Sequence, residues 1–195
     1  MTDGSPTAVL GGFTAHASPP ASTLAAAERA VERSVQRAEG ARSGPVAVLL
    51  RMLADSPPVG CRTVRPRGLT DDVRVTDAAM LNTVLMVAPD DPAAQVLATT
   101  GIAAALAVGD WLELERPEVV VAAAVAFELA ARLHPAVGAD LDARGWDAAA
   151  VLAPVVATAA AARLLRLAPD DVRQALGLAL TQSGGLGSVA GTGAR

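Results

Sequence analysis

The 195-residue sequence contains no lysine and no tyrosine, and it has only one cysteine and two histidines. Without lysine the chain offers no Schiff-base nucleophile, no lysine general base and no P-loop for nucleotide phosphates. Without tyrosine it offers no phenolic acid. Cys61 alone cannot form an intrachain disulfide, and with only His16 and His134 beside it a zinc site of Cys and His ligands is not expected. We therefore predict no metal and no cofactor. Any catalytic groups are expected to be Asp, Glu, Ser, Thr or Arg side chains and at most one histidine.

An excess of positive charge is also missing. The formal net charge is −4, which argues against nucleic acid as a partner. The first twenty residues hold several prolines and no apolar run of the kind found in a signal peptide. The most apolar stretch, residues 148–162, is shorter than the roughly 20 residues that span a bilayer and contains Pro154. These features predict a soluble, cytoplasmic protein without a membrane partner.

Alanine dominates what the sequence does contain. Hydrophobic residues make up 52% of the chain and aromatic residues only 2%, while 45 residues are alanine. Small side chains in close contact suit helices best, because alanine has the strongest helix propensity and loses no side-chain entropy on folding. We predict an all-α bundle of about seven helices.

The chain divides into three parts. Residues 1–20, rich in Gly, Pro, Ser and Thr, are predicted to be a flexible arm, residues 21–182 a helical domain, and residues 183–195 a glycine-rich tail. Apolar periodicity, prolines at first turns and capping residues predict helices over 23–39, 45–53, 77–87, 92–112, 117–134, 147–165 and 169–182.

Three further features of the chain are interpreted from their composition and their place in the sequence. Glu128 lies in the most apolar predicted helix, where a carboxylate would need a buried partner. The stretch 56–72 is predicted to be a loop, and its arginines form either an anion-binding patch or an ordinary solvated surface. The tail is likewise either a ligand-lining segment, a link to another domain or a frayed end.

Several segments together resemble the MmgE/PrpD family, which includes 2-methylcitrate dehydratase and cis-aconitate decarboxylase. The longest runs from Gly145-Trp146-Asp147 through Pro154 and continues in 159–165, 167–171 and 175–186. Upstream, Ala78-Ala79-Met80-Leu81-Asn82 resembles the family's Ala-Ala-x-x-Asn helix, and Asp90-Asp91 resembles its Asp-rich active-site motif. The resemblance covers residue 23 to the end and implies the family's N-terminal helical domain.

The resemblance also implies roles for particular residues. Asp90 takes the place of the first active-site aspartate, and Asp147 stands where the family has a histidine, so both are candidate catalytic bases. Asp91, Gly191, Thr192 and Arg195 are the candidate substrate-binding residues, with Arg195 at a position where the family has lysine. Arginine stays protonated, so it can hold a carboxylate but cannot act as a base. A helix cap is the alternative role for Asp90, Asp91 and Asp147.

These roles imply a lyase, of dehydratase or related isomerase type, that acts on a carboxylate-bearing small molecule. The family's C-terminal domain has no counterpart in these 195 residues, so we expect a truncated family member in which a separately encoded partner supplies that domain. The resemblance and the alanine-rich faces also favour a homodimer. The alternative function is a non-catalytic binding or scaffolding module that keeps the helical fold.

Overall fold

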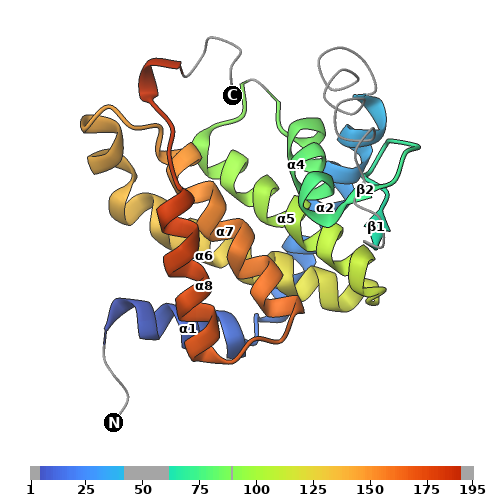
Figure 1. The fold of residues 1–195 in the computed structure, drawn as a ribbon, viewed down its shortest axis with the longest axis horizontal. Helices are drawn as coiled ribbons and strands as arrows, with labels where there is room; N and C mark the ends of the chain where they lie inside the picture. The colour runs from blue at the N-terminus through green and yellow to red at the C-terminus, as the bar shows by residue number, and fades with distance from the viewer. Residues whose placement is uncertain (1–4, 42–61, 89, 190–195) are drawn as a thin grey trace.

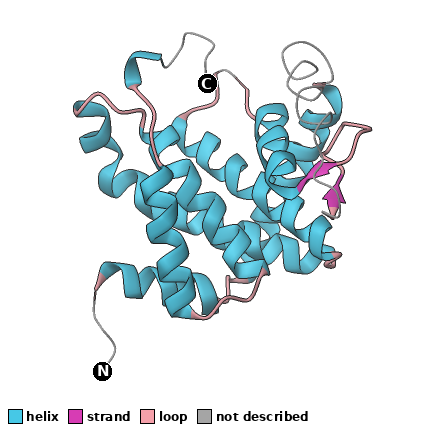
Figure 2. Cartoon of the chain, in the orientation of Figure 1, coloured by secondary structure: helices cyan, strands magenta, loops and turns pink. Residues whose placement is uncertain are grey.

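The structure is a computed structural model that describes residues 5–41, 62–88 and 90–189 (Figure 1). In these ranges it contains seven α-helices and one short antiparallel hairpin, in which Thr63 pairs with Arg74 and Val64 with Val73 (Figure 2). The prediction of an all-α fold of about seven helices is confirmed. The elements are α1 (Pro6–His16), α2 (Ala21–Gly40), β1 (Thr63–Val64), β2 (Val73–Arg74), α4 (Val75–Met86), α5 (Ala93–Leu112), α6 (Arg116–Ala143), α7 (Ala148–Leu164), α8 (Pro169–Gln182) and the 3₁₀ turn η1 (Gly187–Val189).

The core lies where α5, α6 and α7 meet. α5 packs against α4, α6 and α7, while α2 covers α4 and α6 on one side and α1 and α8 cover α7 on the other. Gly101 shows how close these helices come, because a Cβ added there would lie 2.7 Å from the Ala126 Cβ and 3.1 Å from the Val156 Cγ1. The many buried alanines permit this approach, and dispersion contacts between closely packed atoms replace the large aromatic side chains that the chain lacks.

The predicted flexible arm is wrong for residues 6–16, which form α1. Ser5 caps this helix by accepting a hydrogen bond from the Ala8 N–H at 3.3 Å, and Pro6 occupies the first turn, where its missing N–H costs nothing. Gly11 lies against α8 so closely that a Cβ there would be 2.5 Å from the Pro169 carbonyl oxygen. Gly11, whose presence was one reason to predict a flexible arm, therefore permits the close packing of α1 against α8.

The helix predicted to end before Pro135 instead continues as α6 to Ala143. A proline inside a helix leaves the carbonyl four residues earlier without its usual N–H donor. Here that carbonyl belongs to Ala131, which is exposed, so water can satisfy it. Glu128 on the same helix is 39% exposed and pairs with Arg132 at 2.6 Å. The expectation that it needs a buried partner is therefore wrong.

The segment before α4 is held to the bundle by a buried asparagine. Asn82 accepts a hydrogen bond from the Arg67 N–H at 2.8 Å and donates to the Ala103 carbonyl at 3.4 Å. The asparagine of the Ala-Ala-x-x-Asn helix thus joins three elements of the fold. Residues 62–72 contain β1 and a turn, in agreement with a predicted loop, while residues 56–61 and the helix predicted over 45–53 lie outside the described residues.

By length and hydropathy, two of the described helices, α5 and α6, could cross a membrane. In α5, 67% of the most apolar window is buried inside the bundle, as is typical of a core helix.

Candidate functional site

The predicted catalytic residues lie at one end of the central helix pair. α5 and α7 run side by side in the same direction, and both begin at the upper end of the molecule in Figure 1. Gly101 and Val156, which face each other, are each the ninth residue of their helix, so the two helices are also in register. Asp90 and Asp91 precede α5 and Asp147 precedes α7. The fold therefore brings the two predicted acidic positions to the same end of the bundle.

Asp147 is the N-cap of α7. Its Oδ1 accepts hydrogen bonds from the main-chain N–H groups of Ala149 and Ala150 at 2.9 and 3.2 Å. These two donors would otherwise lack an intrahelical partner, and they hold the carboxylate in one position at the end of the helix. The alternative role predicted from the sequence, a helix cap, is confirmed for this residue.

The glycine-rich segment lies against the turn that carries Asp147. The Asp147 N–H donates to the Gly185 carbonyl at 3.0 Å, and the Gly187 N–H donates to the Gly145 carbonyl at 2.8 Å. Between these bonds Trp146 and Leu186 pair as an isolated antiparallel bridge. A Cβ at Gly185 would lie only 2.4 Å from the Ala150 Cβ, so this contact requires glycine. Residues 183–189 are thus held at the Asp147 end of the bundle.

Asp91 holds the α4–α5 connection to α2. Its Oδ2 accepts hydrogen bonds from Arg37 at 2.6 Å and from the Ala88 N–H at 2.8 Å, and its side chain is only 13% exposed. The same Arg37 atom, Nη1, also donates to the Met86 carbonyl at 2.9 Å. These contacts give Asp91 a structural role, and substrate binding by its carboxylate stays a prediction.

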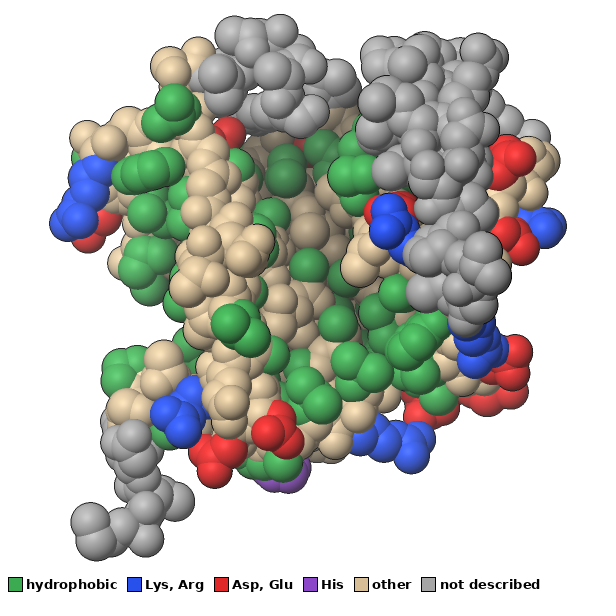
Figure 3. Space-filling model, viewed as in Figure 1, with side chains coloured by type: hydrophobic (Ala, Val, Ile, Leu, Met, Phe, Trp, Pro, Cys, Tyr) green, Lys and Arg blue, Asp and Glu red, His purple; other side chains and the backbone are tan. Residues whose placement is uncertain are grey.

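Asp90 differs from its neighbour. It is exposed, and its side chain makes no hydrogen bond or ion pair with the described part of the chain. Gly191, Thr192 and Arg195, which were predicted to bind substrate, lie outside the described residues. The face seen in Figure 3 is mostly apolar along its centre, with charged side chains at its margins.

Sequence comparison identifies the family. The profile of the MmgE/PrpD N-terminal domain matches residues 13–195. The chain belongs to the MmgE/PrpD family. The match begins inside α1, which agrees with α1 being part of the packed domain rather than an arm.

Two curated relatives carry related names. The cis-aconitate decarboxylase-like protein oryM of Aspergillus oryzae is 47% identical over 68 residues, which cover 34% of this chain and 14% of that protein. The cis-aconitate decarboxylase of Aspergillus terreus is 32% identical over 141 residues, covering 67% of this chain and 28% of that protein. The matches therefore span less than a third of either relative's length.

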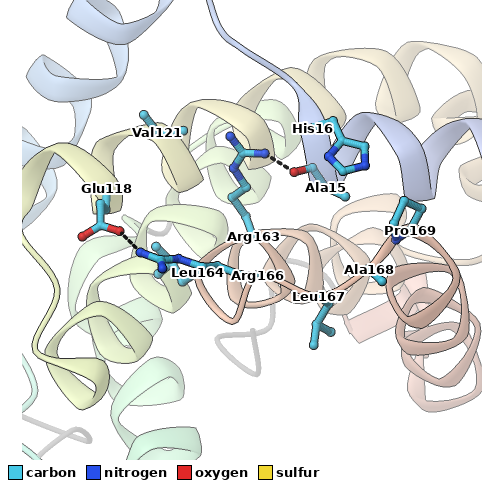
Figure 4. Close-up of a pocket in the computed structure, with 10 residues that line it drawn as sticks. All are labelled: Ala15, His16, Glu118, Val121, Arg163, Leu164, Arg166, Leu167, Ala168 and Pro169. Atoms are coloured by element: carbon cyan, nitrogen blue, oxygen red, sulfur yellow. Dashed lines mark hydrogen bonds and ion pairs between the residues drawn. The ribbon is translucent and has the colours of Figure 1, made fainter.

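Two pockets of this MmgE/PrpD domain are not lined by Asp90, Asp91 or Asp147. One, of about 620 Å³, is lined by residues of α1, α6, α7 and the α7–α8 connection (Figure 4). The other, of about 540 Å³, lies between the hairpin and the end of α5. Its arginines were possible anion ligands, but each already has a carboxylate partner: Arg62 pairs with Glu113, Arg65 with Asp72 and Arg67 with Asp110. This arrangement favours the ordinary-surface interpretation.

Sequence reasoning missed the residues that build these regions. Arg37, in the helix predicted over 23–39, holds Asp91, and Arg163 and Arg166 line the larger pocket. No local pattern indicates which distant carboxylate or pocket an arginine reaches. In the described ranges, no group of three or more His, Cys, Asp or Glu side chains lies close enough to hold a metal ion.

Proposed function

We propose that this chain is the helical domain of a lyase that acts on a carboxylate-bearing small molecule. Membership of the MmgE/PrpD family and the relatives named cis-aconitate decarboxylase support a lyase-like role. The observation that carries the proposal is the pair of main-chain hydrogen bonds that fasten the glycine-rich segment to the Asp147 turn. It brings the segment leading to Gly191, Thr192 and Arg195 to the end of the bundle where Asp90 and Asp91 also lie.

In this proposal Asp147 or Asp90 is the general base. For a β-hydroxy acid, the carboxylate removes a proton from the carbon beside the substrate carboxylate, the C–H electrons form the double bond, and hydroxide leaves the β-carbon and takes up a proton as water. For cis-aconitate, the substrate in the relatives' names, the bond to the departing CO₂ breaks, its electron pair stays on the remaining carbon skeleton, and the same aspartate, in its protonated form, donates the proton that this skeleton takes up. Arg195 pairs with a substrate carboxylate, and Gly191 and Thr192 offer main-chain N–H groups.

The rest of the active site comes from elsewhere in this proposal. Because the matches cover 28% or less of the curated relatives, we propose that a further domain, in this chain's own continuation or in a separately encoded partner, covers the Asp147 end. We also propose that the domain works as a homodimer in the cytoplasm.

A non-catalytic binding or scaffolding module is the second candidate. It is favoured by one observation, that Asp147 and Asp91 both have structural partners that explain why they are there. A module of this kind would keep the helical fold and the Asp147 cap without turnover.

Turnover of cis-aconitate and 2-methylcitrate, followed by proton NMR, separates the two candidates. The protein is assayed alone and with a co-expressed MmgE/PrpD C-terminal domain. If neither preparation converts or binds either acid, the lyase proposal fails and the module remains.

Asp147→Asn tests the base directly. Asparagine caps a helix about as well as aspartate but has no carboxylate, so the lyase proposal predicts that turnover falls at least about 100-fold while the melting temperature stays within about 2 °C. Asp147→Ser keeps a helix-capping side chain and also lacks the carboxylate, so it should lose turnover to the same extent as Asp147→Asn. Unchanged turnover in both variants would remove Asp147 from the mechanism and leave Asp90 as the proposed base.

A further inference from the structure

The larger pocket lies at the opposite end of α7 from Asp147. α7 has 17 residues, so its two ends are separated by about 25 Å. The pocket is formed where the end of α1, the start of α6, the end of α7 and the start of α8 meet (Figure 4). It is therefore a separate feature from the proposed reaction site.

Its walls are apolar with a few charged groups. Val121, Leu164, Leu167, Ala168 and Pro169 supply apolar surface, and the volume of about 620 Å³ is in the range of pockets that hold small molecules. The charged lining residues are Arg163, Arg166 and Glu118. Two cationic groups against one anionic group favour an anion as the occupant.

Arg166 is placed at this pocket by an unusual backbone conformation. Its φ is +54°, in the left-handed region, at the second residue after α7, directly after the C-cap Leu165, where glycine is usually found. An arginine there costs backbone energy that glycine would not, and strained non-glycine residues concentrate at functional sites. The guanidinium extends from this position toward Glu118 (Figure 4).

The present partner of Arg166 is easily replaced. Arg166 pairs with Glu118 at 2.8 Å, but the two side chains are 77% and 41% exposed. Exposed ion pairs of this kind contribute little to stability. A ligand carboxylate can therefore take the place of Glu118 at little cost.

Arg163 provides a second cationic group with a fixed position. It donates from Nη1 to the Ala15 carbonyl, which ties the end of α1 to α7. A guanidinium has five N–H donors in a planar fork, and this hydrogen bond uses one of them. In Figure 4 the Arg163 side chain rises between α1 and α6, beside the apolar residues of the pocket.

We propose that this pocket binds a small aliphatic dicarboxylate, in which one carboxylate pairs with Arg166, the other pairs with Arg163, and the carbon chain lies against Val121, Leu164 and Leu167. The ligand occupies a second site, distinct from the one in which Asp147 acts, and its binding does not require the proposed lyase activity.

Isothermal titration calorimetry with glutarate tests this proposal, with the uncharged glutaramide as the control ligand. The wild-type protein is expected to bind glutarate and not glutaramide, with an affinity that falls as NaCl is raised. Arg166→Gly should weaken binding at least about tenfold. Because glycine suits the left-handed backbone at this position, the same variant should melt no lower than the wild type, so the loss would not come from unfolding.

Glu118→Gln gives a change of opposite sign. It frees Arg166 and removes a negative charge from the pocket, so glutarate should bind several-fold more tightly. Arg144→Gln, which removes an exposed arginine at the far end of α6, is the matched control and should leave the affinity within twofold.

Three outcomes would overturn the proposal. They are no glutarate binding by the wild-type protein, binding within twofold of wild type in Arg166→Gly, and no tightening in Glu118→Gln. Loss of glutarate binding in Asp147→Asn, with Arg166→Gly unaffected, would place the anion at the other end of the bundle and contradict the proposal as well.

Discussion

The Asp147 N–H donates to the Gly185 carbonyl across 3.0 Å, and this bond joins two segments separated by the whole of α7 and α8. Gly185 has a φ of +154°, and a Cβ on it would lie 2.4 Å from the Ala150 Cβ. The close contact leaves no room for a side chain at Gly185, so this part of the attachment requires glycine.

Gly185→Ala is therefore expected to lower the free energy of unfolding by about 1–3 kcal/mol and to free residues 183–189 from the Asp147 turn. Urea denaturation measures the first effect, and faster hydrogen exchange of the Asp147 amide measures the second. Gly184→Ala is the control, because nothing lies within 4 Å of a Cβ at that position. Equal effects of the two substitutions would show that the contact with Ala150 is unimportant.

Asp91 and Asp90 are adjacent but differ in their surroundings. Asp91→Ala removes the partners of Arg37 and of the Ala88 N–H, and we expect it to lower the free energy of unfolding by about 1–3 kcal/mol. Asp90→Ala, an identical substitution at an exposed residue, should change it by less than about 0.5 kcal/mol. Chemical denaturation of both variants checks this.

A double-mutant cycle with Arg37→Gln tests whether the effect comes from the ion pair. If Asp91→Ala is equally destabilising in the Arg37→Gln background, the Arg37 interaction does not account for the loss.

The helices were predictable because their signals are local. Prolines at first turns and the cap at Asp147 lie within a few residues of the ends that they define. The predicted bounds 169–182 coincide with α8, and the predicted bounds 92–112 differ from α5 by one residue, because Pro92 is the N-cap and not the first helical residue. The same local reasoning failed at α1 and at Pro135. A glycine in α1 that packs against α8 looks in sequence like a glycine in a flexible arm. A proline inside a helix, where the carbonyl that lacks its N–H donor belongs to an exposed residue, looks in sequence like a helix end.

The site was predictable only in part, for the same reason. The acidic residues before α5 and α7 were found from the family resemblance, and the cap role of Asp147 from its position before an apolar helix. The contact between Gly185 and Asp147 and the pairing of Arg37 with Asp91 join residues that are 38 and 54 positions apart. Contacts over such separations depend on how the helices pack, which no local pattern in the chain encodes.

The pH dependence of stability should carry a contribution from Asp110. Burial raises the pKa of this carboxyl above the ordinary aspartate value of 3.8, and the charge and hydrogen bond of Arg67 oppose the shift only in part. A raised pKa means that the folded protein holds this proton more tightly than the unfolded chain does. The Asp110 contribution is therefore most favourable below pH 3.8 and is lost as the pH rises from 3.8 through the raised value.

Asp110→Asn removes this titration. The free energy of unfolding of the wild type minus that of the variant should therefore fall as the pH rises through this window, as measured by urea denaturation at a series of pH values. A difference that instead increased with pH would mean that the ion pair with Arg67 outweighs burial and that the pKa of Asp110 is lowered on folding.

Thr14 tests whether α1 is an integral part of the bundle. This side chain is fully buried, and its hydroxyl has no hydrogen-bond partner among the described residues. An unpaired buried hydroxyl is costly, so Thr14→Val, which replaces it with a methyl group of similar size, should raise the free energy of unfolding by about 1 kcal/mol. The matched control is Thr100→Val, because the Thr100 hydroxyl donates to the Val96 carbonyl at 2.9 Å and its loss should lower stability by about 1 kcal/mol. Thermal denaturation of both variants tests this prediction. A lower melting temperature of Thr14→Val would mean that the Thr14 hydroxyl has a hydrogen-bond partner. An unchanged melting temperature would mean that α1 does not bury this side chain.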